Sequence, residues 1–335
     1  MTGVLQVGIS PTLVTQLAIV AVALYTLVTA SQRAIDRLLR LAAYYQVPDV
    51  VVGVTVLALG TSLPELGSHV IASLGILGGV LDYRITSAVV IGGNMGSSTV
   101  QQLLLVGFFV VGYGKVQLTD TFLRDNYAPM VLALLVTLGT VVDGHVSRLD
   151  GLVLLVAYVG YVYYSVQTRE RSAMLPEAAS TNPRSDAVMA TLMLVLVLLS
   201  ASLLLSVIQG VVETLRLGGS IIGVVTIGVA SALPEMTTVL EAIRRRTPNV
   251  ALGTLVGSNV VNPLVGIGLG GVISTYFVPP AVVYWDLPFK ILAAVGLVVY
   301  ATVVSDRAFT RREGVYMIVL YFVFLTTRLL LFPGQ

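Results

Sequence analysis

The sequence predicts an all-α integral membrane protein with about ten transmembrane helices in two inverted five-helix repeats. Its 335 residues have a mean hydropathy of +0.93, and only 11% of them are charged, against about a quarter in a typical soluble domain. The apolar segments run for about 20 residues, the length that crosses a hydrocarbon core of roughly 30 Å as a helix. Short motifs also recur in the same order in both halves of the chain, which predicts a duplicated fold.

Ten apolar runs, separated by charged or Gly/Pro-rich breaks, are the expected spans. Their continuous apolar character favours helices over membrane strands, which alternate apolar and polar residues over about ten positions. The runs cover residues 11–31, 49–76, 85–112, 127–143, 150–167, 187–214, 217–243, 248–276, 280–304 and 314–332. The first run has no positive region before it and no convincing cleavage site, so we expect a retained helix rather than a signal peptide.

One markedly hydrophilic stretch, Arg169 to Asp186, divides the ten runs into two groups of five. It contains Pro176, Pro183 and several Ser and Asn residues, a composition typical of loops. We therefore expect a first five-helix repeat over residues 1–168, a cytoplasmic linker over 169–186 and a second five-helix repeat over 187–335.

Lys and Arg are distributed unevenly over the predicted loops, and cytoplasmic loops retain positive charge. Fourteen of the nineteen basic residues follow odd-numbered spans: Arg33, Arg37, Arg40, Lys115, Arg124, Arg169, Arg171, Arg184, Arg244, Arg245, Arg246, Arg307, Arg311 and Arg312. The opposite side is assigned Arg84, Arg148, Arg216, Lys290 and Arg328. We therefore expect a multi-pass protein of the cell membrane with both termini outside and the linker in the cytoplasm.

Three motifs of the first half recur in order in the second half. The echoes pair Gly60–Leu66 with Ala230–Met236, Gly96–Gln101 with Gly257–Asn262, and Ser147–Gly151 with Thr310–Gly314. Three ordered matches indicate a duplication. Because each half contributes five spans, an odd number, the two copies must enter the membrane from opposite sides, and such inverted repeats place a binding site near the bilayer midplane.

A proline inside the first echo is expected to break its helix. Pro64 and Pro234 each remove one helical hydrogen bond, which frees carbonyl oxygens near residues 58–61 and 228–231. Small residues let neighbouring helices approach closely, and glycines occur for this purpose at positions 92, 93, 96, 253 and 257.

Glu65 and Glu235 are the carboxylates of the first echo, and each lies within a predicted span. A charged side chain there costs at least about 2.5 kcal/mol, so each needs a counter-charge or a proton. Hydroxyl and amide side chains come from the same echoes: Thr61, Ser62, Ser97, Ser231, Ser258, Gln101 and Asn262. Together with the freed carbonyls they make an all-oxygen set, which suits hard cations such as Ca²⁺ and Mg²⁺.

Two carboxylates neutralise one divalent cation, and several monovalent cations or protons compete with it for the same oxygens. One species then leaves as another enters, because an empty charged site resists reorientation across the membrane. A lone Glu could instead be a protonated structural residue, whereas a symmetric pair favours a site. His69 lies one turn after Glu65 on the same helical face, and we favour a hydrogen-bonded helix residue there over a metal ligand or a pH-sensing partner.

An intramembrane enzyme and an ion channel are the rival classes. The chain has only two histidines, His69 and His145, and no HExxH zinc motif. A channel could line a pore with the same oxygens, but its ion flux would be faster than the turnover of a transporter and would not require an ion on the opposite side of the membrane. The net charge of +2 does not indicate a nucleic-acid partner, and the absence of cysteine excludes disulfides and thiolate ligands. We expect the bilayer and the transported cations as partners, no cofactor and no enzymatic activity.

At these echoes the sequence resembles the cation/calcium exchanger superfamily, and within it the prokaryotic sodium/calcium exchangers. Gly60–Glu65 matches the first signature of that family without a change, and Gly257–Asn259 matches the other signature closely. The resemblance covers essentially the whole chain. It implies a cation antiporter that exchanges Ca²⁺ for Na⁺ by alternating access at a midplane site.

The resemblance also implies roles for individual residues, with Glu65 and Glu235 as central ligands shared by Ca²⁺ and Na⁺. The remaining ligands would be carbonyls of Ala58 and Gly228, carbonyls and hydroxyls of Thr61 and Ser231, and hydroxyls of Ser62, Ser97 and Ser258.

This chain departs from the family pattern at three positions. Gln101 and Asn262 are both amides where sodium-exchanging members often have one Asp, and Ala232 replaces the second hydroxyl of the signature. Fewer charges would mean fewer Na⁺ per cycle, coupling to H⁺, or another divalent ion such as Mg²⁺. These alternatives stay open at this point.

Overall fold

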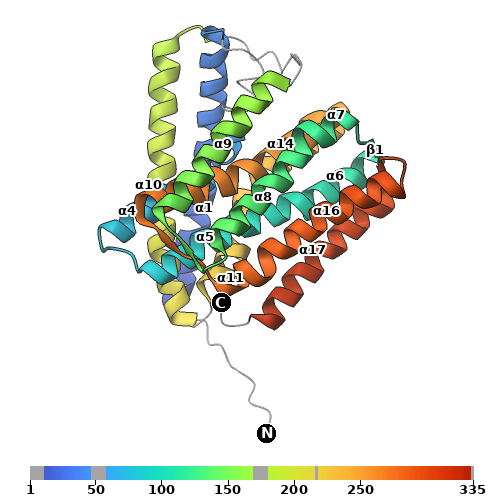
Figure 1. Ribbon diagram of the computed structural model, residues 1–335. Helices are drawn as coiled ribbons and strands as arrows, with labels where there is room; N and C mark the ends of the chain where they lie inside the picture. The colour runs from blue at the N-terminus through green and yellow to red at the C-terminus, as the bar shows by residue number, and fades with distance from the viewer. Residues whose placement is uncertain (1–10, 47–57, 169–179, 216–217, 333–335) are drawn as a thin grey trace.

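The computed structural model describes residues 11–46, 58–168, 180–215 and 218–332. Each of the ten expected spans corresponds to a helix or to a run of consecutive helices (Figure 1). Eight of them are long and apolar enough to cross a membrane, and Leu63–Leu77 is a shorter apolar helix. Large apolar side chains such as Val22, Leu192 and Phe322 are exposed on these helices, as expected where lipid is the solvent.

The first half begins with one long helix and continues through several broken ones. Its elements are α1 (Pro11–Tyr44), α3 (Ala58–Thr61), α4 (Leu63–Leu77), α5 (Tyr83–Thr99), η2 (Val100–Leu105), α6 (Val106–Tyr113), β1 (Lys115–Gln117), α7 (Asp120–Phe122), η3 (Leu123–Tyr127), α8 (Ala128–Val141), β2 (His145–Val146) and α9 (Arg148–Thr168). The elements labelled η are π-helical turns, in which the chain makes i→i+5 hydrogen bonds. The first residues of the expected second span, 49–57, lie outside the described residues.

The second half repeats this order of long, broken and π-helical segments. Its elements are α10 (Pro183–Leu215), α11 (Gly219–Gly223), η4 (Val224–Gly228), α12 (Val229–Ser231), α13 (Leu233–Arg245), α14 (Pro248–Val261), η5 (Asn262–Ile267), α15 (Gly268–Ser274), β3 (Tyr276–Phe277), η6 (Val282–Asp286), α16 (Leu287–Val303), β4 (Ala308–Thr310) and α17 (Arg311–Leu331). The π-helical turns η2 and η5 directly follow equivalent helices, α5 and α14. The two halves therefore share their irregularities as well as their helices.

Helix α1 is longer than the sequence predicts. It continues past residue 31 to Tyr44, so Arg33, Arg37 and Arg40 lie on a helix and not in a loop. No Gly or Pro interrupts the chain there, and α1 packs along α10 (Figure 1). Helix α10 likewise begins at Pro183, inside the expected linker, and Arg37 forms a 2.5 Å ion pair with Asp186 between the two helices. Residues 169–179 of that linker lie outside the described residues.

Two short antiparallel ribbons each join one half to the other. Strand β1 pairs with β4, and β2 pairs with β3. Helix α8 runs between β1 and β2 in the chain, so the two ribbons lie at opposite ends of the helices. An inverted repeat requires this arrangement, because equivalent connections of the two halves must emerge on opposite faces.

The third sequence echo forms equivalent helix starts. The Ser147 backbone N–H and hydroxyl both donate to Asp150 at the start of α9, at 2.9 and 2.6 Å. Thr310 makes the same pair of bonds to Glu313 at the start of α17, and the bond from the Thr310 backbone N–H is one half of a capping box there. Each motif satisfies backbone groups that a helix end otherwise leaves without partners.

Glycines allow the helices to cross at close range in both halves. A Cβ added at Gly107 of α6 would lie 2.7 Å from the carbonyl oxygen of Gly314 in α17, and one at Gly151 of α9 would lie 2.7 Å from that of Gly268 in α15. These crossings are equivalent under the repeat. A Cβ at Gly92 of α5 would overlap the carbonyl oxygen of Ser220 in α11. The expected close approach is therefore confirmed for the α5 glycines at positions 92, 93 and 96, and it is wrong for Gly253, where nothing among the described residues lies within 4 Å of an added Cβ.

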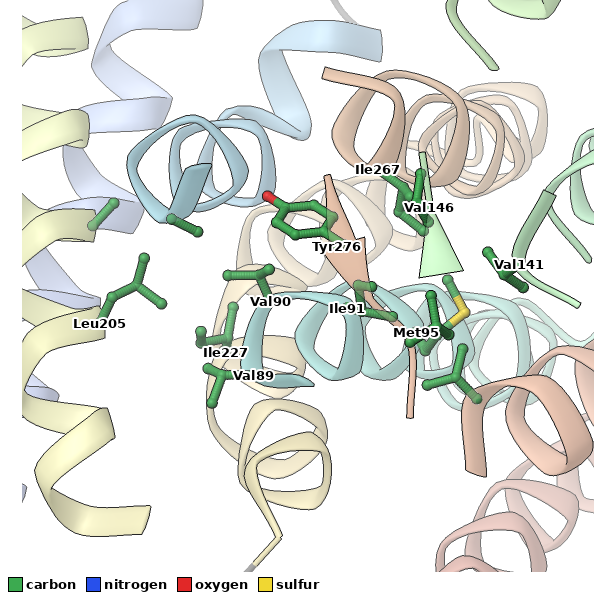
Figure 2. Packing of buried hydrophobic residues seen from close by; sticks show 14 of the residues in the cluster. Val89, Val90, Ile91, Met95, Val141, Val146, Leu205, Ile227, Ile267 and Tyr276 are labelled. Carbon is green, nitrogen blue, oxygen red and sulfur yellow. The ribbon is translucent and has the colours of Figure 1, made fainter. Parts of the chain in front are cut away.

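Helix α5 lies at the centre of the apolar core. Val89, Val90, Ile91 and Met95 on this helix are almost fully buried, and Figure 2 shows Val89 beside Ile227 of η4, with the Tyr276 ring of β3 near Val90 and Ile91. Because apolar side chains surround α5, the polar groups that it carries one turn further along are held away from lipid.

Substitution of Gly92 by Ala is expected to destabilise the protein, because the new methyl group would meet backbone atoms of α11 that cannot rotate away. Overpacking of this kind costs about 1 to 3 kcal/mol. The matched control is Gly139→Ala on α8, where nothing among the described residues lies within 4 Å of the added Cβ. Thermal unfolding in detergent should show a lower Tm for the first variant only; equal Tm values would contradict the close crossing.

Candidate cation site

Two equivalent helix breaks create the framework of the site. Ser62 separates α3 from α4 and Ala232 separates α12 from α13, with φ, ψ of −88°, 6° and −82°, −1°. Each break is followed by a proline that has no N–H for the carbonyl four residues earlier, as the sequence predicts. The chain therefore ends one helix and begins another in the interior of the protein.

Glu65 and Glu235 lie in the first turn of the helices that begin at these breaks. The start of a helix carries a partial positive charge that favours an anion, and the end of the preceding helix presents carbonyl oxygens that favour a cation. The two carboxylates are 1% and 0% exposed. Each break thus supplies a carboxylate and carbonyl oxygens at one place.

Each carboxylate accepts a hydroxyl bond from its own half. Ser97 of α5 donates to Glu65 Oε1 at 2.5 Å, and Ser258 of α14 donates to Glu235 Oε1 at 3.1 Å. The two serines are equivalent residues of the second echo. Thr61 Oγ1 lies 3.1 Å from Ser258 Oγ and joins α3 to the other half.

Each carboxylate also accepts an amide bond from the opposite half. Gln101 Nε2 lies 3.3 Å from Glu235 Oε1, and Asn262 Nδ2 lies 3.4 Å from Glu65 Oε1. These amides come from the equivalent π-helical turns η2 and η5. The bonds around the two carboxylates therefore follow the two-fold relation of the repeat, and all four side chains meet at the interface of the halves.

Several buried oxygens of this cluster have no hydrogen-bond partner within the described part of the chain. They are Glu65 Oε2, Glu235 Oε2, Ser62 Oγ, Ser231 Oγ and Asn262 Oδ1. A buried polar atom without a partner costs free energy, so such atoms indicate a bound ion or water. Carboxylate, hydroxyl and amide oxygens are the ligands that hard cations prefer. We call this cluster the candidate cation site.

The structure brings the predicted side-chain ligands together, but it does not show whether the predicted backbone carbonyls of Ala58 and Gly228 face the site. Ala58 begins α3, and its side chain lies outside the described residues. Gly228 ends the π-helical turn η4, and a Cβ added there would lie 2.8 Å from the backbone nitrogen of Ser97. Both backbones are close to the site, and the roles of their carbonyls remain predictions.

Two residues that support the site were missed by the sequence analysis. Asn259 donates through Nδ2 to Gln101 Oε1 at 3.2 Å, and Asn94 donates to the backbone carbonyl of Asn262 at 2.6 Å. Asn259 belongs to the second echo and could have been found there. Asn94 lies before the echo, and no pattern in the sequence marks it.

A second buried charged cluster corrects the assignment of two basic residues to the outer side of the membrane. Lys290 lies in α16 and Arg328 in α17, and both are fully buried with Asp286. Arg328 Nε lies 2.9 Å from Asp286 Oδ1, and Arg328 also donates to Ser220 of α11 at 2.9 Å. Both residues fall within the expected spans 280–304 and 314–332, so counting them with the loops of the outer side was wrong: their charges are buried inside the protein.

The comparisons with known proteins agree on one family. A sequence model of the family described as "Sodium/calcium exchanger protein" matches residues 15–167 and 185–330. The chain is 24% identical to an inner membrane protein of Escherichia coli, YrbG, over 83% of this chain and 86% of that protein. It is 23% identical to the sodium/calcium exchanger MaX1 of Methanosarcina acetivorans, over 83% of this chain and 88% of that protein.

Solved structures share the fold. The sodium-calcium exchanger NCX_Mj, soaked with 2.5 mM Na⁺ and 0.1 mM Sr²⁺, aligns with a TM-score of 0.63 at 21% identity, over 94% of this chain and 99% of that one. The same protein soaked with 10 mM Na⁺ and no Ca²⁺ aligns with a TM-score of 0.61 at 22% identity, over the same shares. The likeness extends over both halves and confirms the membrane-exchanger fold with its inverted repeats.

Arg328→Met is expected to lower stability by about 3 to 5 kcal/mol, because it leaves a buried carboxylate without its ionic partner. Replacing the whole cluster by apolar residues, as Asp286→Leu, Lys290→Met and Arg328→Met together, should recover most of that loss. Tm values in detergent would test both expectations. A single variant as stable as the parent protein would show that the buried ion pair does not contribute in this way.

Proposed function

The chain belongs to the sodium/calcium exchanger protein family, and on that premise we propose that it is an antiporter that exchanges Ca²⁺ for Na⁺ at the candidate cation site. The observation that carries the proposal is the symmetric pair Glu65 and Glu235, each with one carboxylate oxygen that has no partner among the described residues. Hydroxyl and amide groups fix the other oxygen of each carboxylate, which leaves the free oxygens available to a cation.

Charge balance explains why the site exchanges ions. Two buried carboxylates without a cation leave two negative charges in a low-dielectric interior, which is costly. One Ca²⁺ or two Na⁺ restore neutrality. The empty site therefore resists the change between inward and outward access, and one kind of cation is carried in each direction by alternating access near the midplane.

The oxygen set favours Ca²⁺ among divalent ions. Ca²⁺ accepts six to eight oxygen ligands in flexible geometry, whereas Mg²⁺ requires a near-ideal octahedron and retains water. The five orphaned oxygens around Glu65 and Glu235 come from both halves and from short helix ends. Such a set adapts its distances to a larger ion. Gln101 and Asn262 add no third carboxylate, so we expect at most two Na⁺ to replace one Ca²⁺.

We place the protein in the cell membrane with the β1–β4 ribbon toward the cytoplasm. Lys115 of β1 lies at this end, and Arg307, Arg311 and Arg312 lie beside or directly after β4, as the retention of positive charge in the cytoplasm favours. The β2–β3 ribbon then faces outward. With this orientation the linker is cytoplasmic and both termini are outside.

Glu65→Gln and Glu235→Gln are each expected to abolish Na⁺-dependent Ca²⁺ uptake. Each substitution leaves one carboxylate against a divalent ion, and the charge deficit is not compensated in the membrane interior. The measurement is ⁴⁵Ca²⁺ uptake into proteoliposomes loaded with Na⁺, with K⁺-loaded and acid-loaded vesicles beside them. Asp36→Asn serves as the matched control, because it removes an exposed carboxylate of α1.

The parent protein and Asp36→Asn should take up Ca²⁺ only into vesicles loaded with Na⁺. Uptake by both Glu variants should equal that of protein-free vesicles. Uptake that follows the proton gradient alone would overturn the choice of coupling ion. Full uptake in either Glu variant would overturn the site. Absence of Ca²⁺ flux under every gradient would overturn the calcium assignment and make Mg²⁺ flux the next measurement.

A further inference from the structure

A buried polar network lies beside the candidate cation site, on the side of Glu65. His69 is one turn after Glu65 on α4 and is 1% exposed. Its Nδ1 lies 3.2 Å from the Tyr276 hydroxyl, and its Nε2 lies 3.1 Å from Asn94 Nδ2. The Tyr276 hydroxyl also contacts Ser73 Oγ at 2.9 Å and donates to the His69 carbonyl at 3.0 Å. Figure 2 shows the Tyr276 ring on β3 with its oxygen directed toward α4, the light blue helix that carries His69.

The contacts of Asn94 fix which nitrogen of His69 accepts and which donates. Its amide faces the backbone carbonyl of Asn262 at 2.6 Å. A carbonyl only accepts, so the group that faces it is the NH₂ of Asn94 and not the amide oxygen. The same NH₂ faces His69 Nε2, which must therefore be the accepting nitrogen. The ring hydrogen is then on Nδ1, where Tyr276 accepts it.

Both nitrogens of His69 are thus engaged, and neither is available to a metal ion. The ring is also packed closely, because a Cβ added at Gly266 of η5 would lie 2.9 Å from both the His69 ring and Asn94 Nδ2. Among the described residues, the hydrogen bonds of the His69 ring lead to the site through Asn94. This agrees with the interpretation of His69 as a hydrogen-bonded helix residue.

Asn94 connects His69 to a predicted ligand. Asn262 is the first residue of η5, and its Nδ2 reaches back to Glu65 Oε1 at 3.4 Å. Its Oδ1 has no partner among the described residues. The chain of contacts from His69 through Asn94 and Asn262 to Glu65 therefore closes on α4. Asn94 fixes the backbone of Asn262, and the Asn262 side chain bonds Glu65 through Nδ2.

Within the described part of the chain, no equivalent network lies beside Glu235. The repeat places Val239 at the position of His69 and Leu255 at the position of Asn94, and both are buried in the apolar core. Gln101, the equivalent of Asn262, is held through its side-chain oxygen by Asn259. The two amides of the site are thus positioned by different means, although the carboxylates and serines are symmetric.

We propose that His69 is a positioning residue for cation exchange, which acts through Asn94 to hold Asn262 as an oxygen ligand on the side of Glu65. The inference rests on the proposed function, since it assigns a role within that site. Loss of an outer residue that orients a metal ligand typically weakens metal affinity by about 10- to 100-fold. His69 should therefore set the Ca²⁺ affinity and leave the maximal rate nearly unchanged.

The test compares His69→Val, which installs the residue of the other half, with His69→Gln, whose amide oxygen still accepts from Asn94. Na⁺-dependent ⁴⁵Ca²⁺ uptake gives KM and the maximal rate, and the Ca²⁺-dependent rise of Tm in detergent gives affinity without transport. His69→Val should raise KM about tenfold or more. The Ca²⁺ concentration that gives half of the rise in Tm should increase by the same factor. His69→Gln should return KM close to the parent value.

Asn94→Leu removes the hydrogen bond between residues 69 and 94 by changing its other partner, and it replaces His69→Val in the test if His69→Val does not fold. It should raise KM as His69→Val does, and the double variant should be no worse than either single one, because both act through one path. Unchanged KM in these variants, additive effects in the double variant, or loss of maximal rate at constant KM would overturn the proposal.

The two proposals fail separately. If the parent protein takes up no Ca²⁺ under a Na⁺ gradient, the proposed function fails. The Tm response to Ca²⁺, Na⁺ and Mg²⁺ still identifies the cation that binds the parent protein, and His69→Val must weaken that response for the role of His69 to stand.

Discussion

Two carboxylates in the interior of a membrane protein are far from water, and each costs several kcal/mol unless a cation or a proton compensates its charge. Glu65 and Glu235 are held in that situation by the fold itself. Each lies at the start of a helix that begins at a proline-dependent break, and each has one oxygen fixed by hydrogen bonds and one left free. The requirement for a compensating cation or proton follows from this geometry.

The inverted repeat explains how a single short motif builds a complete site. One copy provides a carboxylate, a hydroxyl and an amide, and the second copy provides the same set from the opposite side. The amides cross between halves, so neither half is complete alone: Gln101 bonds Glu235 and Asn262 bonds Glu65. Glycine crossings at equivalent places bring the helices close enough for these bonds.

Much of the fold and most of the site side chains could be predicted from the sequence, because duplication makes equivalent residues meet. The echoes around Glu65 and Ser97 identified the carboxylates, the serines and both amides. Asn94 and Tyr276 could not be predicted, since they come from positions without an echo and approach His69 only through packing. The length of α1 was underestimated because Arg33 and Arg37 were interpreted as loop residues. Lys290 and Arg328 were counted with the outer side because the charge count assigned every basic residue to a side, although these two lie within expected spans.

The symmetry of the site is incomplete, and its departures distinguish this chain. The carboxylates and serines agree between halves, whereas the supports behind the two amides differ: a histidine network for Asn262 and an asparagine for Gln101. No third carboxylate accompanies the pair at these amide positions. The charge of the site is therefore set by two residues, and its shape is set by neighbours that the repeat does not share.

The most direct test of this account is anomalous diffraction from crystals of the protein soaked in Sr²⁺, a heavier analogue of Ca²⁺. The account predicts one principal peak between the halves, in direct contact with carboxylate oxygens of both Glu65 and Glu235 and absent from crystals of either Gln variant. A peak bound by only one of the two carboxylates, or a principal peak elsewhere in the protein, would contradict the shared two-carboxylate site.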